Sequence, residues 1–350
     1  MEGKQKVEKP TQDKLRSLVE GKTVLVTGGT GTIGSEIVNQ LIPLKPRIIR
    51  ILSRDEYKQS LLRYKYREHD FIRYLLGDVR DYERLSRAFE GVHVVFHTAA
   101  LKRVEATEYD PLEAVKTNVL GTQNIITATL ESNTVERVVS ISTDKAVNVT
   151  STMGATKLLA ERLVTWASFY RRIPHKTLSS VRFGNVLDSR GSVIPLWREQ
   201  IKDGGPVTLT DPNMRRFFMS IPNAVSLVLK SAAHATGGEI YILRMKSAHI
   251  SDLAEILIEE LAPLYGRKSA EIEIKITGAE PGEKLDEDLV APNELPRTYT
   301  VDNELAVIAP AHRQDEYKLK KLDSFDGYVT SSNTLSKEEL REYLKQEKII

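Results

Sequence analysis

Short apolar runs rich in β-branched residues alternate with helical segments along the chain, and this alternation constrains the fold more than any other feature. The first run, Lys22–Thr27, leads into the glycine-rich stretch TGGTGTIG and then into a helical segment. Strands and helices that alternate at this spacing form right-handed βαβ units, whose parallel sheet is covered on both faces. The sequence therefore predicts an α/β protein with a Rossmann-type, doubly wound parallel sheet.

The expected elements follow this rhythm until about residue 183 and more loosely beyond it. Strands are expected at Lys22–Thr27, Arg47–Leu52, Phe71–Leu76, Val92–His97, Val135–Ile141, Leu178–Phe183, Val207–Thr210 and Glu239–Leu243. Helices are expected at Asp13–Val19, Ser35–Leu44, Tyr82–Glu90, Pro111–Asn133, Lys157–Arg172, Leu196–Asp203, Asn223–Ala235 and Asp252–Leu264, with Ser336 capping a last one. Loops are expected at Gly184–Pro195 and Asp211–Phe218.

This pattern divides the chain into four expected parts. They are a charged N-terminal arm (1–20), a cofactor-binding Rossmann domain (21–183 plus 218–245), a smaller substrate-binding domain (184–217 plus 246–330) and a C-terminal tail helix (331–350). A chain of 350 residues is long enough to give both larger parts a hydrophobic core.

Charge and composition exclude several classes of function. The net charge is +2 and the basic residues are interleaved with acidic ones, which argues against a nucleic-acid or membrane-surface partner. Cysteine is absent, so disulfides and cysteine nucleophiles are excluded. No apolar run approaches the roughly 18 residues of a membrane span. We expect a cytoplasmic protein without a metal site, since His69, His93, His234 and His249 lack ligand spacing.

The glycine-rich stretch predicts a dinucleotide site. Gly28, Gly31 and Gly34 lie between the first strand and the first helix, where the missing Cβ atoms allow a tight turn and close approach to a diphosphate. Glycine spacing alone also fits an ordinary strand–helix turn. The complete order of strand, turn, helix and second strand favours the dinucleotide.

Which dinucleotide binds depends on the end of the second strand. A carboxylate there binds the ribose hydroxyls of NAD. If Ser53 takes that place, Arg54 and Lys58 suit the extra phosphate of NADP, which is the preferred interpretation; a longer strand would instead use Asp55 and favour NAD. The pairs Asp78-Val79 and Ala99-Ala100 follow two other strands and are expected beside the adenine and the ribose. Alternatively they are a helix N-cap and packing residues.

The stretch from Val138 to Glu161 predicts proton-transfer chemistry. Thr143, Asp144 and Lys145 leave the end of one strand together, and Lys157 follows on the next helix. A carboxylate and amines placed this close can divide acid and base roles. His97 also ends a strand, and a hydrogen-bonded packing role is favoured for it over a role in the site.

These pieces together resemble the extended short-chain dehydrogenase/reductases that act on nucleotide sugars, and within them the UDP-N-acetylglucosamine 4,6-dehydratases of polysaccharide synthesis. The matching stretches run in family order from residue 27 to 285, about three quarters of the chain: TGGTGTIG, SRDEYKQS, GDVRD, HTAALKRVE, EAVKTNVLGTQN, STDKA, MGATK, RFGNVLDSRGSVIP, TDPNMRRFFM and PGEKL. The C-terminal YVTSSNTLSKEELREYL resembles the ending of the soluble members that invert carbon 5.

The resemblance implies a role for individual residues. Asp144 would be the acid at carbon 6 and Lys145 the base at carbon 5, with Thr143 bonding the sugar and Lys157 the nicotinamide ribose. It adds Thr30, Thr32, Ile33 and Asn118 to the cofactor set. It implies UDP-sugar contacts at Lys102, Asn185, Arg190, Ser192, Val193, Arg216 and Glu283. Asp188 replaces a usual glycine and Glu280 a usual arginine, which leaves one diphosphate contact open.

Met153 departs from the wider superfamily, which carries a tyrosine four residues before the helical lysine. A thioether carries no proton. Either the chain is a non-catalytic NADP-binding protein, or Asp144 takes over the first deprotonation, as the methionine variants of the dehydratase branch imply. We expect Lys157 and the charge of the bound cofactor to lower the pKa of Lys145. A nucleotide-sugar 4-epimerase is the alternative enzyme, and a homo-oligomer is expected by analogy.

Overall fold

The computed structural model describes residues 9–169 and 175–350. Most of the first half of the expected N-terminal arm and the end of the helix expected to reach Arg172 therefore lie outside the described residues. Within the described ranges, a large sheet of nine strands has the order β13-β14-β10-β6-β5-β4-β1-β2-β3. Its strands are β1 Thr23–Thr27, β2 Ile48–Ser53, β3 Ile72–Leu76, β4 Val94–His97, β5 Arg137–Ile141, β6 Thr177–Arg182, β10 Ile240–Leu243, β13 Thr298–Thr300 and β14 Leu305–Ile308.

The seven strands from β3 to β10 are mutually parallel, which confirms the predicted fold class. β1 pairs with β2 on one side and with β4 on the other, where Thr27 lies opposite His97. The chain thus reverses its direction of winding between β1 and β4. In sheets of this type, ligands bind beyond the carboxyl ends of the strands at such a point.

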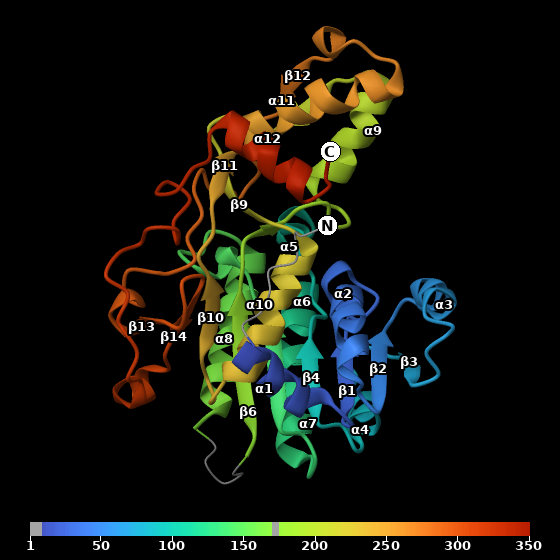
Figure 1. Cartoon of the computed structure of the whole chain (residues 1–350), viewed down its shortest axis with the longest axis vertical. Coiled ribbons are helices and arrows are strands. Elements are labelled where there is room, and N and C mark those ends of the chain that lie inside the picture. Colours follow the sequence, from blue (N-terminus) through green and yellow to red (C-terminus); the bar gives the residue numbers. More distant parts are fainter. Residues whose placement is uncertain (1–8, 170–174) are drawn as a thin grey trace.

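Helices cover both faces of this sheet because alternate strand residues are apolar on both sides. Val24 and Val26 of β1 pack with the helices α1 (Lys9–Val19), α2 (Thr32–Leu41) and α10 (Ile221–His234). Leu25 packs with α4 (Tyr82–Phe89) and α7 (Gly121–Glu131) on the other face. Figure 1 shows α1, α2 and α10 on the near face of the sheet. The helices are α1 Lys9–Val19, α2 Thr32–Leu41, α3 Glu56–Lys65, α4 Tyr82–Phe89, α8 Thr152–Ala167 and α10 Ile221–His234.

The segment expected to be one helix from Pro111 to Asn133 is interrupted. It runs as α6 Pro111–Ala114, a π-helical segment Val115–Leu120 and α7 Gly121–Glu131, and a short α5, Val104–Tyr109, precedes it. A π-helical segment inside an α-helix frequently marks a functional site. This one contains Asn118, a predicted cofactor residue.

A smaller region with its own core lies at one end of the sheet (Figure 1). Its core includes Trp197 of α9, Leu257 of α11 and Leu340 of α12. Its helices are α9 Val193–Asp203, α11 Ile250–Leu261 and α12 Lys337–Gln346, and its strands are β7 Asn185–Val186, β8 Val207–Leu209, β9 Arg215–Met219, β11 Ser247–His249 and β12 Ile274–Ile276. Single turns of 3-10 helix occur at Ile42–Leu44, Asp144–Ala146, Pro263–Tyr265, Ser269–Glu271 and Leu295–Arg297, and a longer one at Ala311–Glu316.

Three expectations about loops and strands in the second half were wrong. The expected loop Asp211–Phe218 contains most of β9, which pairs with both β7 and β11. The expected loop Gly184–Pro195 contains β7 and the start of α9. The unpredicted strands β13 and β14 extend the main sheet in antiparallel fashion, so this part of the expected substrate domain contributes to the Rossmann sheet.

The predicted cap at Ser336 is confirmed. Its side chain accepts a hydrogen bond from the Glu339 amide, and the Glu339 side chain accepts one from the Ser336 amide, which is a complete capping box. No helix within the described ranges is long and apolar enough to cross a membrane.

Candidate active site

The glycine-rich turn between β1 and α2 is too tightly packed for other residues. Gly28 has a positive φ of 66°, and a Cβ atom there would lie 2.7 Å from the Ala99 amide nitrogen. A Cβ at Gly34 would lie 2.5 Å from the Gly28 carbonyl oxygen, so α2 packs directly on the turn. Gly31 precedes Thr32, where α2 begins without a side-chain cap. This geometry fits the diphosphate of a dinucleotide.

The end of β2 places a hydroxyl where NAD-binding proteins have a carboxylate. β2 ends at Ser53, whose Oγ lies 2.6 Å from Thr30 Oγ1 on the glycine-rich turn. Asp55 lies beyond the strand and caps α3, because its Oδ1 accepts a hydrogen bond of 2.9 Å from the Lys58 amide. Arg54 is half exposed, 3.5 Å from Asp78. Lys58 Nζ lies 2.5 Å from Asp55, so both cations at this strand end lie beside a carboxylate.

The neighbouring strand ends carry the other predicted cofactor residues. Asp78 accepts hydrogen bonds of 2.9 Å from the Arg80 amide and from Arg80 Nε. It is not a helix N-cap, because Asp81 caps α4. Val79 is buried against Gly121, where a Cβ would lie 2.8 Å from Val79 Cγ2. This close packing brings the π-helical segment to the strand ends.

Asp144 and Lys145 form a contact pair at the carboxyl end of β5. Asp144 is fully buried. Its Oδ1 accepts hydrogen bonds from Thr143 Oγ1 at 2.8 Å and from Lys145 Nζ at 3.1 Å. Its Oδ2 is buried and has no hydrogen-bond partner among the described residues. Such an unpaired oxygen marks a position where a ligand or a proton can be accommodated.

Lys145 contacts a second carboxylate that the sequence analysis missed. Its Nζ lies 3.2 Å from Oε1 of the buried Glu287 and 3.5 Å from Asn185 Oδ1. Burial lowers the pKa of Lys145, but Asp144 and Glu287 outweigh that effect and raise it. Lys157, which was expected to lower this pKa, is not among the groups that shift it, and the lowering expected from the charge of a bound cofactor stays a prediction.

Helix α8 begins at the site and delivers Met153 and Lys157. Ser151 caps it by accepting a hydrogen bond from the Gly154 amide. Met153 is buried, and Lys157 Nζ donates a hydrogen bond to the Ile141 carbonyl at the end of β5. Burial lowers the pKa of Lys157 to about 8, although Glu161 opposes the shift.

Two other buried polar residues connect helices with the end of β4 and the residues that follow it. Asn118 bonds both backbone groups of Leu101 and donates to Thr156 of α8 at 3.0 Å. His97 bonds Thr27 through one ring nitrogen and Thr122 through the other, and burial lowers its pKa to about 3. His97 is thus a neutral packing residue, as the sequence analysis favoured.

The predicted substrate residues fall into two groups. Asn185 and Arg216 lie beside Lys145. Arg216 is buried and donates a hydrogen bond of 3.1 Å to the Leu285 carbonyl. Its positive charge lowers the pKa of Lys145. Ser192 precedes α9, whose first residue is Val193, and its buried Oγ has no partner among the described residues. Glu283 accepts a hydrogen bond from the Glu280 amide at 3.1 Å and closes its own turn.

The second group lies across the glycine-rich turn. Arg190 donates a side-chain hydrogen bond to the Thr30 carbonyl, and its amide bonds Thr32 Oγ1 at 3.2 Å. Lys102 Nζ donates to the Arg190 carbonyl at 2.9 Å. The structure therefore joins these two residues, predicted for the sugar nucleotide, to the cofactor turn.

The departure at Asp188 has a structural explanation. Asp188 has a positive φ of 55°, which accounts for the glycine usual in similar sequences. Aspartate tolerates this left-handed conformation better than most residues. Its Oδ1 also accepts a hydrogen bond of 2.7 Å from Arg198 of α9. The substitution therefore preserves the turn and fastens it to the next helix.

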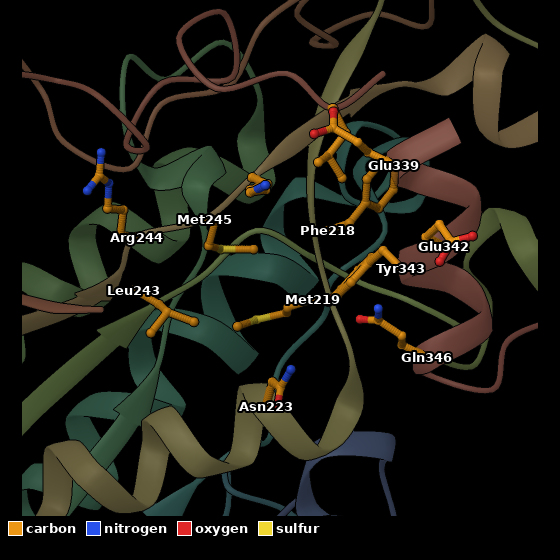
Figure 2. A pocket seen from close by; sticks show the side chains of 12 residues that line it. Phe218, Met219, Asn223, Leu243, Arg244, Met245, Glu339, Glu342, Tyr343 and Gln346 are labelled. Carbon is orange, nitrogen blue, oxygen red and sulfur yellow. The ribbon is translucent and has the colours of Figure 1, made fainter. Parts of the chain in front are cut away.

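A groove of about 430 Å³ lies between α10 and α12, away from these residues. Figure 2 shows Met219, Met245 and Leu243 on one side of it and Tyr343 of α12 on the other. None of the predicted site residues lines it. The candidate chemistry therefore lies at the carboxyl ends of β1, β4 and β5, not in this groove.

The fold and the site together define the class of protein. A Rossmann-type sheet with a dinucleotide turn, a lysine on α8 and an acid–base pair at the end of β5 is that of an extended short-chain dehydrogenase/reductase that modifies nucleotide sugars. The chain belongs to the Polysaccharide biosynthesis protein family, whose sequence profile matches residues 24–309.

Comparisons with individual proteins agree with this assignment. The chain is 55% identical over 281 residues to the "Uncharacterized membrane protein MJ1061" of Methanocaldococcus jannaschii, covering 80% of this chain and 84% of that protein. It is 41% identical over 281 residues to the "UDP-glucose 4-epimerase" of Rickettsia typhi, covering 78% and 79%. The solved structure of Pen from Bacillus thuringiensis is similar with a TM-score of 0.88 and 41% identity, covering 94% of this chain and 98% of Pen.

Proposed function

We propose that this protein is an NADP-dependent UDP-N-acetylglucosamine 4,6-dehydratase, a lyase that forms a UDP-4-keto-6-deoxy-N-acetylhexosamine with inverted carbon 5 for surface polysaccharide synthesis. The observation that carries the proposal is the Asp144–Lys145 pair, which lies at the carboxyl end of β5 beside α8. Dehydration needs an acid and a base at neighbouring carbons, and these two side chains can supply them.

The cofactor would be held by residues from three strand ends. The diphosphate would bind at the N-terminus of α2, which begins at Thr32, the ribose phosphate at Arg54 and Lys58, and the nicotinamide ribose at Lys157. The bound cofactor supplies reversible hydride transfer, accepting hydride from carbon 4 of the sugar and returning it to carbon 6. NADP is preferred over NAD because β2 ends at Ser53 and Asp55 is engaged as a helix cap.

Asp144 would act first as a base and then as an acid. Its unpaired Oδ2 would take the proton of the carbon 4 hydroxyl, directly or through a water, and this loss together with the loss of hydride from carbon 4 would leave the sugar as a ketone. The protonated Asp144 then donates that proton to the departing hydroxyl at carbon 6, and water leaves. One residue thereby replaces the proton transfer that Met153 cannot perform.

Lys145 would remove the proton from carbon 5, which the ketone at carbon 4 has acidified, and a proton would return to carbon 5 when hydride returns to carbon 6. Its raised pKa depends on both Asp144 and Glu287. Once Asp144 has taken a proton, only Glu287 remains as an anion beside Lys145. The pKa of Lys145 then falls, and a larger fraction of the lysine is in the neutral form that can act as a base. The first step therefore prepares the base that the second step requires.

A UDP-hexose 4-epimerase is the second candidate, favoured by the name of the Rickettsia typhi relative. This reaction shares the oxidation at carbon 4 but needs neither proton transfer at carbon 5 nor an acid at carbon 6. Asp144 could serve this reaction as the base at carbon 4, but Lys145 would have no task in it. A non-catalytic NADP-binding protein leaves both this pair and the UDP-sugar residues without one.

One experiment separates the three functions. The purified protein is incubated with UDP-N-acetylglucosamine and NADP⁺, and the nucleotide sugar is weighed by mass spectrometry. Loss of one water supports the dehydratase, an isomer of equal mass the epimerase, and unchanged substrate the binding protein. Proton coupling constants of the product then report the configuration at carbon 5.

We further propose a cytoplasmic homo-oligomer, which cell fractionation and analytical ultracentrifugation would test.

A further inference from the structure

Glu287 is a buried carboxylate with no place in the steps described so far. It lies between two lysines: Oε1 is 3.2 Å from Lys145 Nζ, and Oε2 is 2.9 Å from Lys284 Nζ, an ion pair whose angle does not fit a hydrogen bond. Its side chain is 2% exposed. With Asp144 it completes an alternating row of charges in which Lys145 is flanked by two carboxylates.

The backbone of Glu287 is fixed by the C-terminal stretch YVTSSNT. Thr330 accepts a hydrogen bond from the Glu287 amide at 3.0 Å and donates its own amide to the Glu287 carbonyl at 3.0 Å. Thr330 Oγ1 also donates to Asp286 at 2.7 Å. The next residue, Asp288, forms an antiparallel bridge with Val329. The position of Glu287 is therefore set by the tail and not by Lys145 alone.

A buried ion network fixes the other end of the same segment. Arg182 of β6 bonds Glu294 at 2.8 Å, the Leu289 carbonyl at 2.7 Å, and Glu161 of α8 at 2.7 Å. This network ties the chain after Glu287 to the helix that carries Lys157. The segment that presents Glu287 is thus anchored on both sides of the residue.

We propose that Glu287 is a positioning residue for Lys145, which holds the amine against Asp144 and sets the pH range over which it exchanges protons. The charged groups that face Lys145 are Asp144 on its own turn, Glu287, and Arg216 of β9. Of these, Glu287 is the one anion that stays in place when Asp144 becomes protonated in the proposed function, on which this inference rests. It limits how far the amine can be deprotonated at neutral pH and keeps it oriented.

The first test does not depend on the reaction catalysed. Lys145 in the full-length protein is labelled with acetic anhydride over a range of pH, and the labelled peptide is quantified by mass spectrometry. In Glu287→Gln the labelling midpoint of Lys145 should move to lower pH, because an anion that stabilises the ammonium is gone. In Lys284→Gln it should move to higher pH, because the cation that competes for Glu287 is gone. Lys157 serves as the internal reference.

Asp288→Asn is the matched control, because Asp288 is the next carboxylate along the chain and bonds Asn148, not Lys145. It should leave the Lys145 midpoint unchanged. Circular dichroism and thermal melting identify variants that fail to fold, and only folded variants are compared. A Glu287→Gln midpoint equal to that of the wild type overturns the inference.

A second test uses the reaction itself. The rate of solvent deuterium uptake at carbon 5 is measured as a function of pH. In Glu287→Gln the pH at which this rate rises should be lower than in the wild type. The rate at which the bound cofactor is reduced by hydride from carbon 4 should be unchanged. Equal losses in both steps would contradict the inference. If the wild type releases no water from UDP-N-acetylglucosamine, the proposed function fails, while the labelling test still decides whether Glu287 controls Lys145.

Discussion

Lys157 Nζ donates a hydrogen bond to the carbonyl oxygen of Ile141, the last residue of β5, three residues before Asp144. The helical lysine is thus held by the main chain of the strand that delivers the acid–base pair. Met153 lies four residues before Lys157 and is buried in the first turn of α8. The lysine therefore has a fixed position without a phenol beside it.

Met153→Leu should retain most of the dehydratase activity. A thioether carries no proton, so its removal takes no step out of the proposed mechanism. Exchange of methionine and leucine in a core usually costs less than about 1.5 kcal/mol of stability. Steady-state rates and thermal melting check both statements. A well-folded Met153→Leu protein that is as inactive as a variant without the Asp144 carboxylate would show that the sulfur has a chemical role.

The lowered pKa of Lys157 should make stability depend on pH. The native pKa is about 8, whereas an unfolded lysine titrates near 10.4. Between these values the unfolded chain binds more protons, so this lysine makes the free energy of unfolding rise with pH. The raised pKa of Lys145 acts with the opposite sign, but only above the unfolded value.

Lys157→Met isolates this contribution. At pH 7 the variant lacks the cost of burying the ammonium, and its advantage over the wild type should shrink between pH 8 and 10 by up to about 3 kcal/mol. Urea unfolding at several pH values measures the difference. A difference that stays constant over this window would show that Lys157 is charged throughout.

Arg54→Ala should weaken the binding of NADP⁺ about tenfold to a hundredfold, the usual range for a lost charge-assisted hydrogen bond. NAD⁺ binding should change little, because Arg54 lies at the strand end where the extra phosphate would sit. Isothermal titration calorimetry measures both affinities. Arg63→Ala, on the following helix α3 and packed over Tyr74, is the control. Equal losses for both cofactors would contradict the NADP assignment.

Structural features formed by residues that are close together in the sequence were predictable. The glycine-rich turn was recognised because its strand, turn and helix follow one another, and Gly28 and Gly34 meet the tight contacts expected of them. The cap at Ser336 was recognised because its partner Glu339 is three residues away. The parallel strands are short apolar runs whose ends differ from the expected ones by at most two residues.

Features that depend on distant partners were not predictable. β9 looked like a basic loop because its strand pairing comes from β7 and β11, not from its own pattern. Glu287 gave no signal, since its contact with Lys145 exists only once the chain has folded. From the sequence Asp188 was only a departure from a usual glycine, because its left-handed backbone and its bond to Arg198 exist only in the folded chain.

The division of labour between Asp144 and Lys145 is the central claim, and Asp144→Asn tests it most directly. The variant keeps the shape of the side chain but cannot take a proton. In a single turnover with UDP-N-acetylglucosamine and bound NADP⁺, the absorbance of the reduced cofactor and the mass of the sugar are followed together. The account predicts that neither cofactor reduction nor water loss occurs, while NADP⁺ still binds. Cofactor reduction at the wild-type rate would contradict it.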